Sequence, residues 1–227
     1  MNYPDFPKLE GKHAYLAPSK KGWENKTVGE LIDGYSRSYS QLIGTAVHDI
    51  ARRHIERHAK IANSDLKEIR LQTIEYYDIP EFAINRGVDF EMIFETAKRY
   101  VNDALGFRLV PEQKLCYNED IAFGTADTIS QLDSVFDKRF LRIHDLKTGI
   151  KEADMAQLEK YAALFFLEFE GEMKRRKLSV ADIEMELRIY QLGEIVVHHP
   201  TVEDIAPIMD IYKTDVSALT KLKTEES

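Results

Sequence analysis

The stretch Phe140-Leu-Arg-Ile-His-Asp-Leu-Lys147 combines apolar residues with two charged residues at its end. Side chains alternate across a β-strand, and on this basis four of them are expected on one face: Leu141, Ile143, Asp145 and Lys147. A buried aspartate is costly unless it has a partner or a metal, and Lys147 is two residues away. Taken alone, the pattern favours an Asp–Lys ion pair at the end of a strand. The chemical alternative is a site at the end of a buried strand.

A second acid lies in the preceding apolar segment, Ile121-Ala-Phe-Gly-Thr-Ala-Asp127. The same alternation places four residues on one face: Phe123, Thr125, Asp127 and Ile129. If this strand pairs with the next across a turn at 133–139, Asp127 and Asp145 converge; otherwise Asp127 is an exposed edge-strand acid. Two close carboxylates repel, and a hard divalent ion with oxygen ligands relieves that repulsion.

The rest of the chain predicts helices alternating with short strands. Helices are expected over residues 42–62, 64–77, 90–105 and 154–176 and from residue 201, and strands over 114–118, 121–132, 140–147, 186–192 and 195–198. This order predicts one α/β domain over residues 1–227, with a central mixed β-sheet flanked by helices. Residues 1–26 are expected to be an irregular N-terminal segment and residues 222–227 a frayed tail.

Composition excludes several classes of protein. The 227 residues carry 31 Lys and Arg against 39 Asp and Glu, a formal charge of −8, which argues against coating nucleic acid by bulk charge. The one cysteine, Cys116, permits no internal disulfide, four-thiolate zinc site or iron–sulfur cluster. No apolar run approaches the ~18–20 residues that span a bilayer, and the N-terminal residues lack the pattern of a signal peptide. A cytoplasmic protein is therefore expected.

Two helical motifs add polar groups. In Gly44-Thr-Ala-Val-His48 the glycine permits close backbone approach, although a lone helix histidine is more often a packed or surface residue than a ligand. Gln157 and Tyr161 lie four residues apart, on one face of the helix predicted there. Without further context both are surface polar residues.

Taken in order, these motifs resemble the PD-(D/E)XK nuclease superfamily. The resemblance rests on Gly44–His48, Glu112, Gly124-Thr-Ala-Asp127, Asp145-Leu-Lys147-Thr-Gly149 and Gln157–Tyr161. The branch it resembles most is that of RecB-type nuclease domains and lambda-type phage exonucleases. The similarity covers residues 14–198 and implies a restriction-endonuclease-like core without an iron–sulfur cluster.

The resemblance also implies roles for individual residues. His48, Asp127, Asp145 and the main-chain carbonyl of Leu146 correspond to the ligands of Mg²⁺ or Mn²⁺. Asp127 and Asp145 form the catalytic set together with Lys147, the catalytic lysine. Gln157 and Tyr161 correspond to residues near the substrate backbone, and Glu112 matches the acidic residue before the first core strand.

The function implied by the resemblance is that of a Mg²⁺- or Mn²⁺-dependent deoxyribonuclease, and more narrowly an exonuclease. Such an enzyme hydrolyses phosphodiester bonds during DNA recombination, repair or phage DNA processing. Its partner is DNA, together with a separate recombinase, single-strand-binding protein or helicase, since no helicase motif is present. The setting implied is the cytoplasm of a bacterium or a phage-infected host, and lambda-type relatives form rings, so a homo-oligomer is a further expectation.

Local positive charge supplies candidate phosphate contacts. Arg52 and Arg53 follow His48 directly and are expected to bind the substrate. Lys174-Arg-Arg-Lys177 could also follow phosphates, or could stabilise the carboxyl end of a helix.

Two other functions remain open at this stage. The first is a catalytically inactive nuclease-fold module that binds DNA or a protein; it predicts no stabilisation by Mg²⁺. The second is an unrelated α/β interaction protein, in which Asp127 and Asp145 lie far apart.

Overall fold

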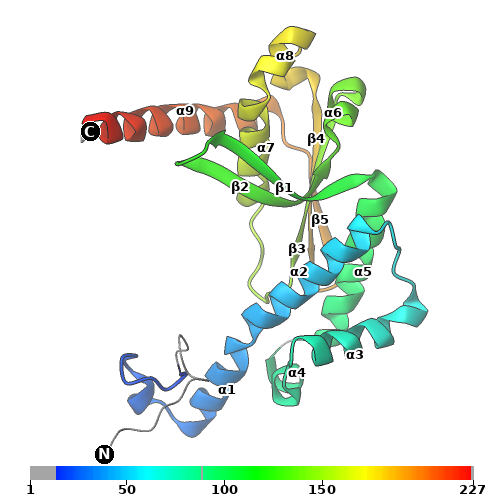
Figure 1. Ribbon diagram of the computed structural model, residues 1–227, viewed down its shortest axis with the longest axis vertical. Coiled ribbons are helices and arrows are strands. Elements are labelled where there is room, and N and C mark those ends of the chain that lie inside the picture. Colours follow the sequence, from blue (N-terminus) through cyan, green and yellow to red (C-terminus); the bar gives the residue numbers. More distant parts are fainter. Residues whose placement is uncertain (1–13, 88, 226–227) are drawn as a thin grey trace, which may run out of the picture.

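A five-stranded mixed sheet forms the centre of the computed structural model, which describes residues 14–87 and 89–225 (Figure 1). Its strands are β1 Leu109–Asn118, β2 Ala122–Ser130, β3 Phe140–Lys147, β4 Glu184–Gln191 and β5 Glu194–His198. They lie in the order β1-β2-β3-β4-β5, with β3 and β4 parallel and the other neighbours antiparallel. The predicted class, α/β with a mixed central sheet flanked by helices, is confirmed, and the arrangement is compatible with a restriction-endonuclease-like core.

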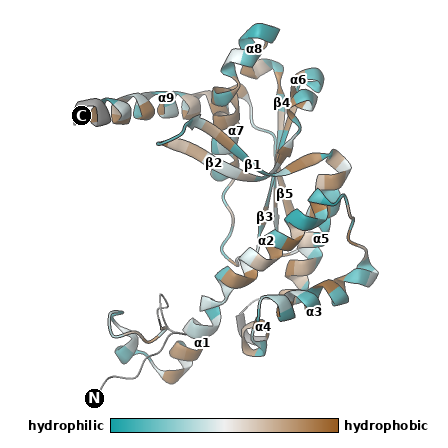
Figure 2. Cartoon of the chain, in the orientation of Figure 1, coloured by the Kyte–Doolittle hydropathy of each residue, from teal (hydrophilic) through white to brown (hydrophobic). Residues whose placement is uncertain are grey.

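Helices cover both faces of this sheet. The α-helices of the described residues, not all of which touch the sheet, are α1 Val28–Ser38, α2 Ser40–Glu56, α3 Leu66–Tyr76, α4 Glu81–Gly87, α5 Phe90–Phe107, α6 Leu132–Lys138, α7 Ala156–Glu168, α8 Glu170–Arg176 and α9 Val202–Glu225. One buried cluster joins α2 and α5 to the sheet, and another joins α7 and α9 to its other face. Helix α9 alternates hydrophilic and hydrophobic residues along its length and projects away from the sheet (Figure 2).

Strand β3 has the bounds expected from its sequence. Leu141 and Ile143 are completely buried in the cluster beneath α7, whereas Leu146 is buried in the cluster beneath α2 and α5. A strand that is covered on both faces is apolar on both. The two charged residues at its end are therefore held at the border of the core.

Strand β2 departs from the predicted alternation. Phe123 is 64% exposed and Ile129 only 2% exposed, so the two do not share an environment. The cause is the limited pairing of β2 with β3, whose register covers Thr128 with His144 and Ile129 with Ile143. The first part of β2 pairs with β1 alone, and this hairpin extends beyond the rest of the sheet (Figure 1).

Several predicted boundaries are wrong. Residues 132–138 form helix α6 where a turn was expected, and α1 and α4 were not predicted. The helix expected over 154–176 is divided at Phe169 into α7 and α8. Helix α9 continues to Glu225, so residues 222–225 of the predicted frayed tail are helical. Of the irregular N-terminal segment, residues 1–13 lie outside the described residues, and a short 3₁₀ turn occurs at Trp23–Asn25.

No helix in the described part of the chain is long and apolar enough to cross a lipid bilayer.

Candidate functional site

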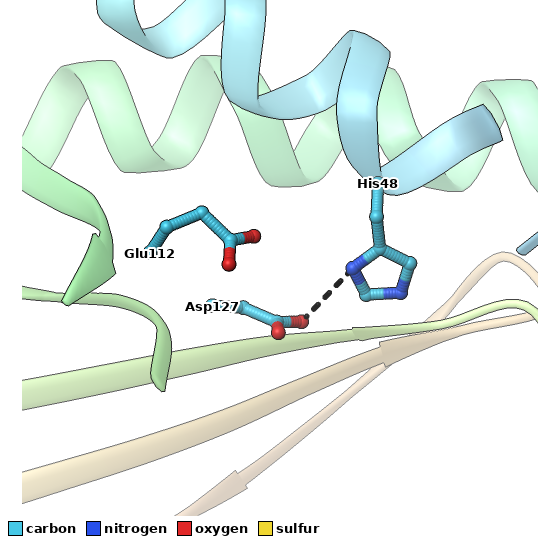
Figure 3. A group of neighbouring side chains, drawn as sticks. All are labelled: His48, Glu112 and Asp127. Atoms are coloured by element: carbon cyan, nitrogen blue, oxygen red, sulfur yellow. Dashed lines mark ion pairs between the residues drawn. The ribbon is translucent and has the colours of Figure 1, made fainter. Parts of the chain in front are cut away.

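Three side chains from three different elements meet in an open cleft beside the sheet. His48 comes from α2, Glu112 from β1 and Asp127 from β2, and their ligand atoms all lie within 4.8 Å of one another (Figure 3). The Nδ1 atom of His48 is 3.4 Å from Oδ2 of Asp127. One imidazole and two carboxylates at this separation form a group that could hold a metal ion.

Helix α2 reaches the site because Gly44 allows it to pass close to the chain after β3. A Cβ atom at position 44 would lie 2.9 Å from Oγ1 of Thr148, closer than side chains tolerate. Val47 and Ala51 bury the inner face of α2, which directs His48 toward β2. The close approach expected of Gly44 is therefore confirmed.

Glu112 is directed into the cleft by an unusual backbone conformation. Its φ is +51°, a left-handed value that is rare for a residue other than glycine. The β1–β2 register pairs Pro111 with Thr128 and Gln113 with Ala126, so Glu112 lies at the level of Asp127 without forming a regular ladder pair. Such a conformation costs free energy of order 1–3 kcal/mol and is concentrated at functional sites.

Asp127 is the electrostatic centre of the group. Burial and the nearby charge of Asp145 raise its pKa to about 7, against a smaller lowering by the main-chain N–H of Leu146. That N–H donates a hydrogen bond of 2.9 Å to Oδ2. Asp127 and Asp145 therefore influence one another, as the predicted pairing of their strands requires. A carboxyl group with this pKa lacks a full positive partner.

His48 is prepared to act as a neutral ligand. Burial lowers its pKa, and the charges of Asp145 and Glu112 and a hydrogen bond with the main chain of Leu146 oppose that effect. A neutral imidazole is the form that binds metal. Leu146 thus contacts both sides of the group, donating its N–H to Asp127 and lying against His48.

Beside the cluster of His48, Glu112 and Asp127, a series of polar contacts runs from Asp145 through Lys147 to Gln157. The Lys147 ammonium lies 3.1 Å from Oδ1 and 2.9 Å from Oδ2 of Asp145, and it donates a 2.9 Å hydrogen bond to Gln157. Nε2 of Gln157 is 3.4 Å from the Tyr161 hydroxyl. Asp145 is 3% exposed, and its buried Oδ2 has the ammonium nearby but accepts no well-directed hydrogen bond. The ion pair that the pattern of β3 alone favoured is present.

The position of Tyr161 depends on Gly124. A Cβ atom at position 124 would lie 2.8 Å from Cε1 of Tyr161, so the ring rests directly on the backbone of β2. The predicted spacing of Gln157 and Tyr161 on one helix is confirmed by α7, which presents both toward this edge of the sheet.

The structure divides the predicted site residues into two adjoining sets. The metal group contains His48, Asp127 and Glu112, whereas Asp145 belongs to the polar chain with Lys147. The sequence predicted Asp145 as a ligand beside His48 and Asp127, with Glu112 as a further candidate, and the charge of Asp145 acts on both His48 and Asp127. The positive φ of Glu112 explains how this residue reaches the cluster, because nothing in a one-dimensional pattern predicts such a conformation within a strand.

The two arginines predicted to bind the substrate, Arg52 and Arg53, face different spaces. Arg52 lines the cleft and pairs with Asp49 at 2.7 Å and with Glu56 at 2.8 Å. Arg53 faces another cavity, between α2 and α3. Asp49 was not predicted, although its spacing of three and four residues from the two arginines is a recognisable signal on a helix.

Three residues of the second basic run pair with acids of their own helix. Lys174 and Arg176 pair with Glu170 and Glu172, one helical turn earlier, and Arg175 also contacts Glu172. Helix α8 lies on the other side of the sheet from α2 (Figure 1). These contacts support the interpretation that the run stabilises the end of α8.

The residues of the cleft fit a divalent cation. Two carboxylates and a neutral imidazole supply oxygen and nitrogen donors, and burial together with the nearby charge of Asp145 raises the pKa of Asp127. Mg²⁺ and Mn²⁺ accept such oxygen-rich sets. Chemically, the arrangement places a candidate cation site beside an oriented ammonium group. No protein-family model, no curated protein and no solved structure matches the chain.

Proposed function

We propose that this protein is a divalent-metal-dependent phosphodiester hydrolase that acts on DNA. The observation that carries the proposal is the proximity of two unlike groups, whose charges act on one another. An acidic cluster with an imidazole, His48, Glu112 and Asp127, adjoins a lysine whose ammonium is held by Asp145 and Gln157. A structural ion pair has no need of the acidic cluster beside it.

The acidic cluster would hold the ion, with Mg²⁺ or Mn²⁺ as the candidates. A divalent ion there supplies a Lewis acid for a phosphate oxygen and a source of hydroxide near neutral pH. The protein keeps the ligands in place before binding. The N–H of Leu146 orients the Asp127 carboxylate, and the backbone of Glu112 is already bent toward the cleft.

Lys147 would act on the phosphate itself. Its ammonium is a concentrated positive charge with more than one donor N–H, and it is directed by Asp145 and Gln157 before substrate arrives. In this position it stabilises negative charge that develops on the phosphate and orients the attacking water. Gln157 accepts a hydrogen bond from the ammonium and contacts the Tyr161 hydroxyl, and both residues would offer polar atoms to the substrate backbone.

The charge of the chain is compatible with a substrate that is a polyanion. The formal charge is −8, and acids line the cleft, so the bare site repels phosphate. Binding of a divalent ion offsets the charge of the two carboxylates, Glu112 and Asp127. The cleft would therefore hold a phosphate of the DNA only when it is loaded with metal, and the bulk charge of the chain would not retain the polymer elsewhere. Roles in recombination, repair or phage DNA processing, and a recombinase, single-strand-binding protein or helicase as partner, belong to this proposal.

The test uses the purified protein with end-labelled linear DNA and closed circular DNA. We expect cleavage with Mg²⁺ or Mn²⁺ and none with EDTA. Loss of label from linear DNA with circular DNA intact identifies an exonuclease, and nicking of the circle identifies an endonuclease. DNA binding without cleavage and without stabilisation by Mg²⁺ or Mn²⁺ would contradict the proposal and favour an inactive nuclease-fold module.

A further inference from the structure

A cavity separate from the metal cluster lies between α2 and α3. Its volume is about 460 Å³, within the range of small-molecule sites. Apolar and aromatic side chains line it together with basic and polar ones and one acid, Glu75; those used below are Ile50, Arg53, Arg57, Ile69, Tyr76 and Tyr77. Both helices contribute to the same buried cluster on one side of the sheet, and α2 also carries His48 of the cleft.

Asp49 links this cavity to the cleft. It lines the cleft, where it pairs with Arg52. Its other oxygen lies 2.6 Å from Arg53 and accepts a hydrogen bond from the Tyr77 hydroxyl, and both of these partners line the cavity. Asp49 therefore lies at the border of both spaces, which adjoin one another along α2.

The cavity offers flat and apolar surfaces. Ile50 and Ile69 contribute aliphatic surface, and Tyr76 is 68% exposed although it is an aromatic residue. The Arg53 guanidinium lies 5.3 Å from the centre of the Tyr76 ring. Aromatic rings and guanidinium planes are the surfaces on which unpaired nucleic-acid bases stack.

Arg57 adds a positive charge that is not neutralised. Among the described residues its side chain has no ion pair or hydrogen bond, in contrast to Arg52 and Arg53, which pair with Asp49. It lies four residues after Arg53, on the same side of α2. A guanidinium that is free and lies beside an apolar surface is suited to a phosphate group. The carboxyl end of α2 would also favour a cation there, but that effect does not explain the exposed ring of Tyr76.

We propose that this cavity binds one nucleotide unit, with the base against Tyr76 and the isoleucines and the phosphate at Arg57. The unit is either part of a single DNA strand that extends from the cleft or a nucleoside monophosphate. This inference rests on the proposed function, because only a nucleic-acid substrate in the cleft makes an adjoining nucleotide site useful.

The experiment measures binding without cleavage. A fluorescently labelled single-stranded oligonucleotide is titrated with protein in EDTA, and deoxyadenosine monophosphate is used as competitor. We expect wild-type protein to bind, and Arg57→Ala and Tyr76→Ala each to weaken binding by at least about fivefold, from the usual contribution of a base–aromatic or phosphate contact. Competition by the monophosphate at low concentration identifies a product site, and weak competition identifies a site for a unit of the strand.

Two controls keep the result specific. Arg37→Ala removes an exposed arginine from the last turn of α1, which lines neither space, and should leave binding unchanged. Tyr76→Phe keeps the ring and should bind like wild type. The inference is overturned if wild-type protein does not bind, or if Arg57→Ala and Tyr76→Ala bind normally. In the latter case metal-dependent cleavage can still be present, so the proposed function survives. Nucleotide binding that needs both residues in a protein without cleavage would reject the proposed function alone.

Discussion

Two acids on the same sheet, Glu186 and Asp127, have opposite electrostatic surroundings. Glu186 of β4 accepts hydrogen bonds of 2.9 Å from Arg142 and from Arg188. Asp127 of β2 has a main-chain N–H and an imidazole beside it, together with the negative charges of Asp145 and Glu112. The negative charge of Glu186 is balanced by two arginines, whereas the charge of Asp127 has other acids beside it.

The pKa values express the same difference. The pKa of Glu186 is held well below its ordinary value by the nearby His144 imidazole and by the two arginines, although burial opposes them. Nε2 of His144 is 3.9 Å from Oε1, too far for a hydrogen bond, so it acts as a neighbouring polar group. Burial and Asp145 raise the pKa of Asp127 to about 7. A cation site needs carboxylates whose charge is not already balanced by arginine or lysine, as at Asp127. Glu186, which pairs with two arginines, is a structural residue.

Catalysis should distinguish the two regions most strongly. Asp145→Asn removes the carboxylate that orients Lys147, and we expect the rate of metal-dependent DNA cleavage to fall by about 10²–10³-fold, the usual cost of losing a preorganised charge contact. Glu186→Gln should stay within about threefold of wild type, because it touches neither the cleft nor Lys147. Cleavage rates under single-turnover conditions provide the measurement. Equal losses in both variants would show that the cleft has no special role.

Stability should change in opposite directions when each acid becomes an amide. In metal-free protein Asp127→Asn relieves repulsion and should raise the free energy of unfolding by about 1 kcal/mol. Glu186→Gln leaves two arginines without a charged acceptor and should lower it by about 1–3 kcal/mol. Urea unfolding in EDTA measures both. A decrease of equal size in the two variants would remove the distinction between a compensated and an uncompensated acid.

A smaller effect is expected from pH. Because the pKa of Glu186 is lowered in the folded protein, its contribution is fully present above the ordinary value of 4.5 and is lost as pH falls toward the folded pKa. The difference in unfolding free energy between wild type and Glu186→Gln should therefore be constant near neutrality and shrink below about pH 4.5. Unfolding curves at a series of pH values test this. A difference that grows on acidification would contradict the assigned contacts.

The elements with regular patterns could be predicted from the sequence. Strand β3 was expected with its observed bounds because its apolar residues are buried on both faces and a charged end follows. The spacing of Gly44 and His48, and of Gln157 and Tyr161, depends only on helical periodicity, which is set locally. Helix α1 was missed even though Thr27 and Glu30 form a capping box that the sequence displays.

The features set by tertiary structure could not be predicted. The left-handed backbone of Glu112 arises in the β1–β2 hairpin, and it places this acid in a cluster with His48 and Asp127. Arg52 and Arg53 are adjacent in sequence, yet successive positions on a helix point about 100° apart, so they face different spaces. The residue types therefore predicted roughly where the candidate site lies, and the fold determines which side chains come together there.

Titration calorimetry with Mn²⁺ and Mg²⁺ on metal-free protein tests the central claim most directly. We predict saturable binding to wild type, a loss of affinity of at least about tenfold in Asp127→Asn and in Glu112→Gln, and unchanged affinity in Glu186→Gln. Circular dichroism of each variant confirms that it is folded. The account is contradicted if wild-type protein binds neither ion, or if Asp127→Asn and Glu112→Gln bind them as tightly as wild type does.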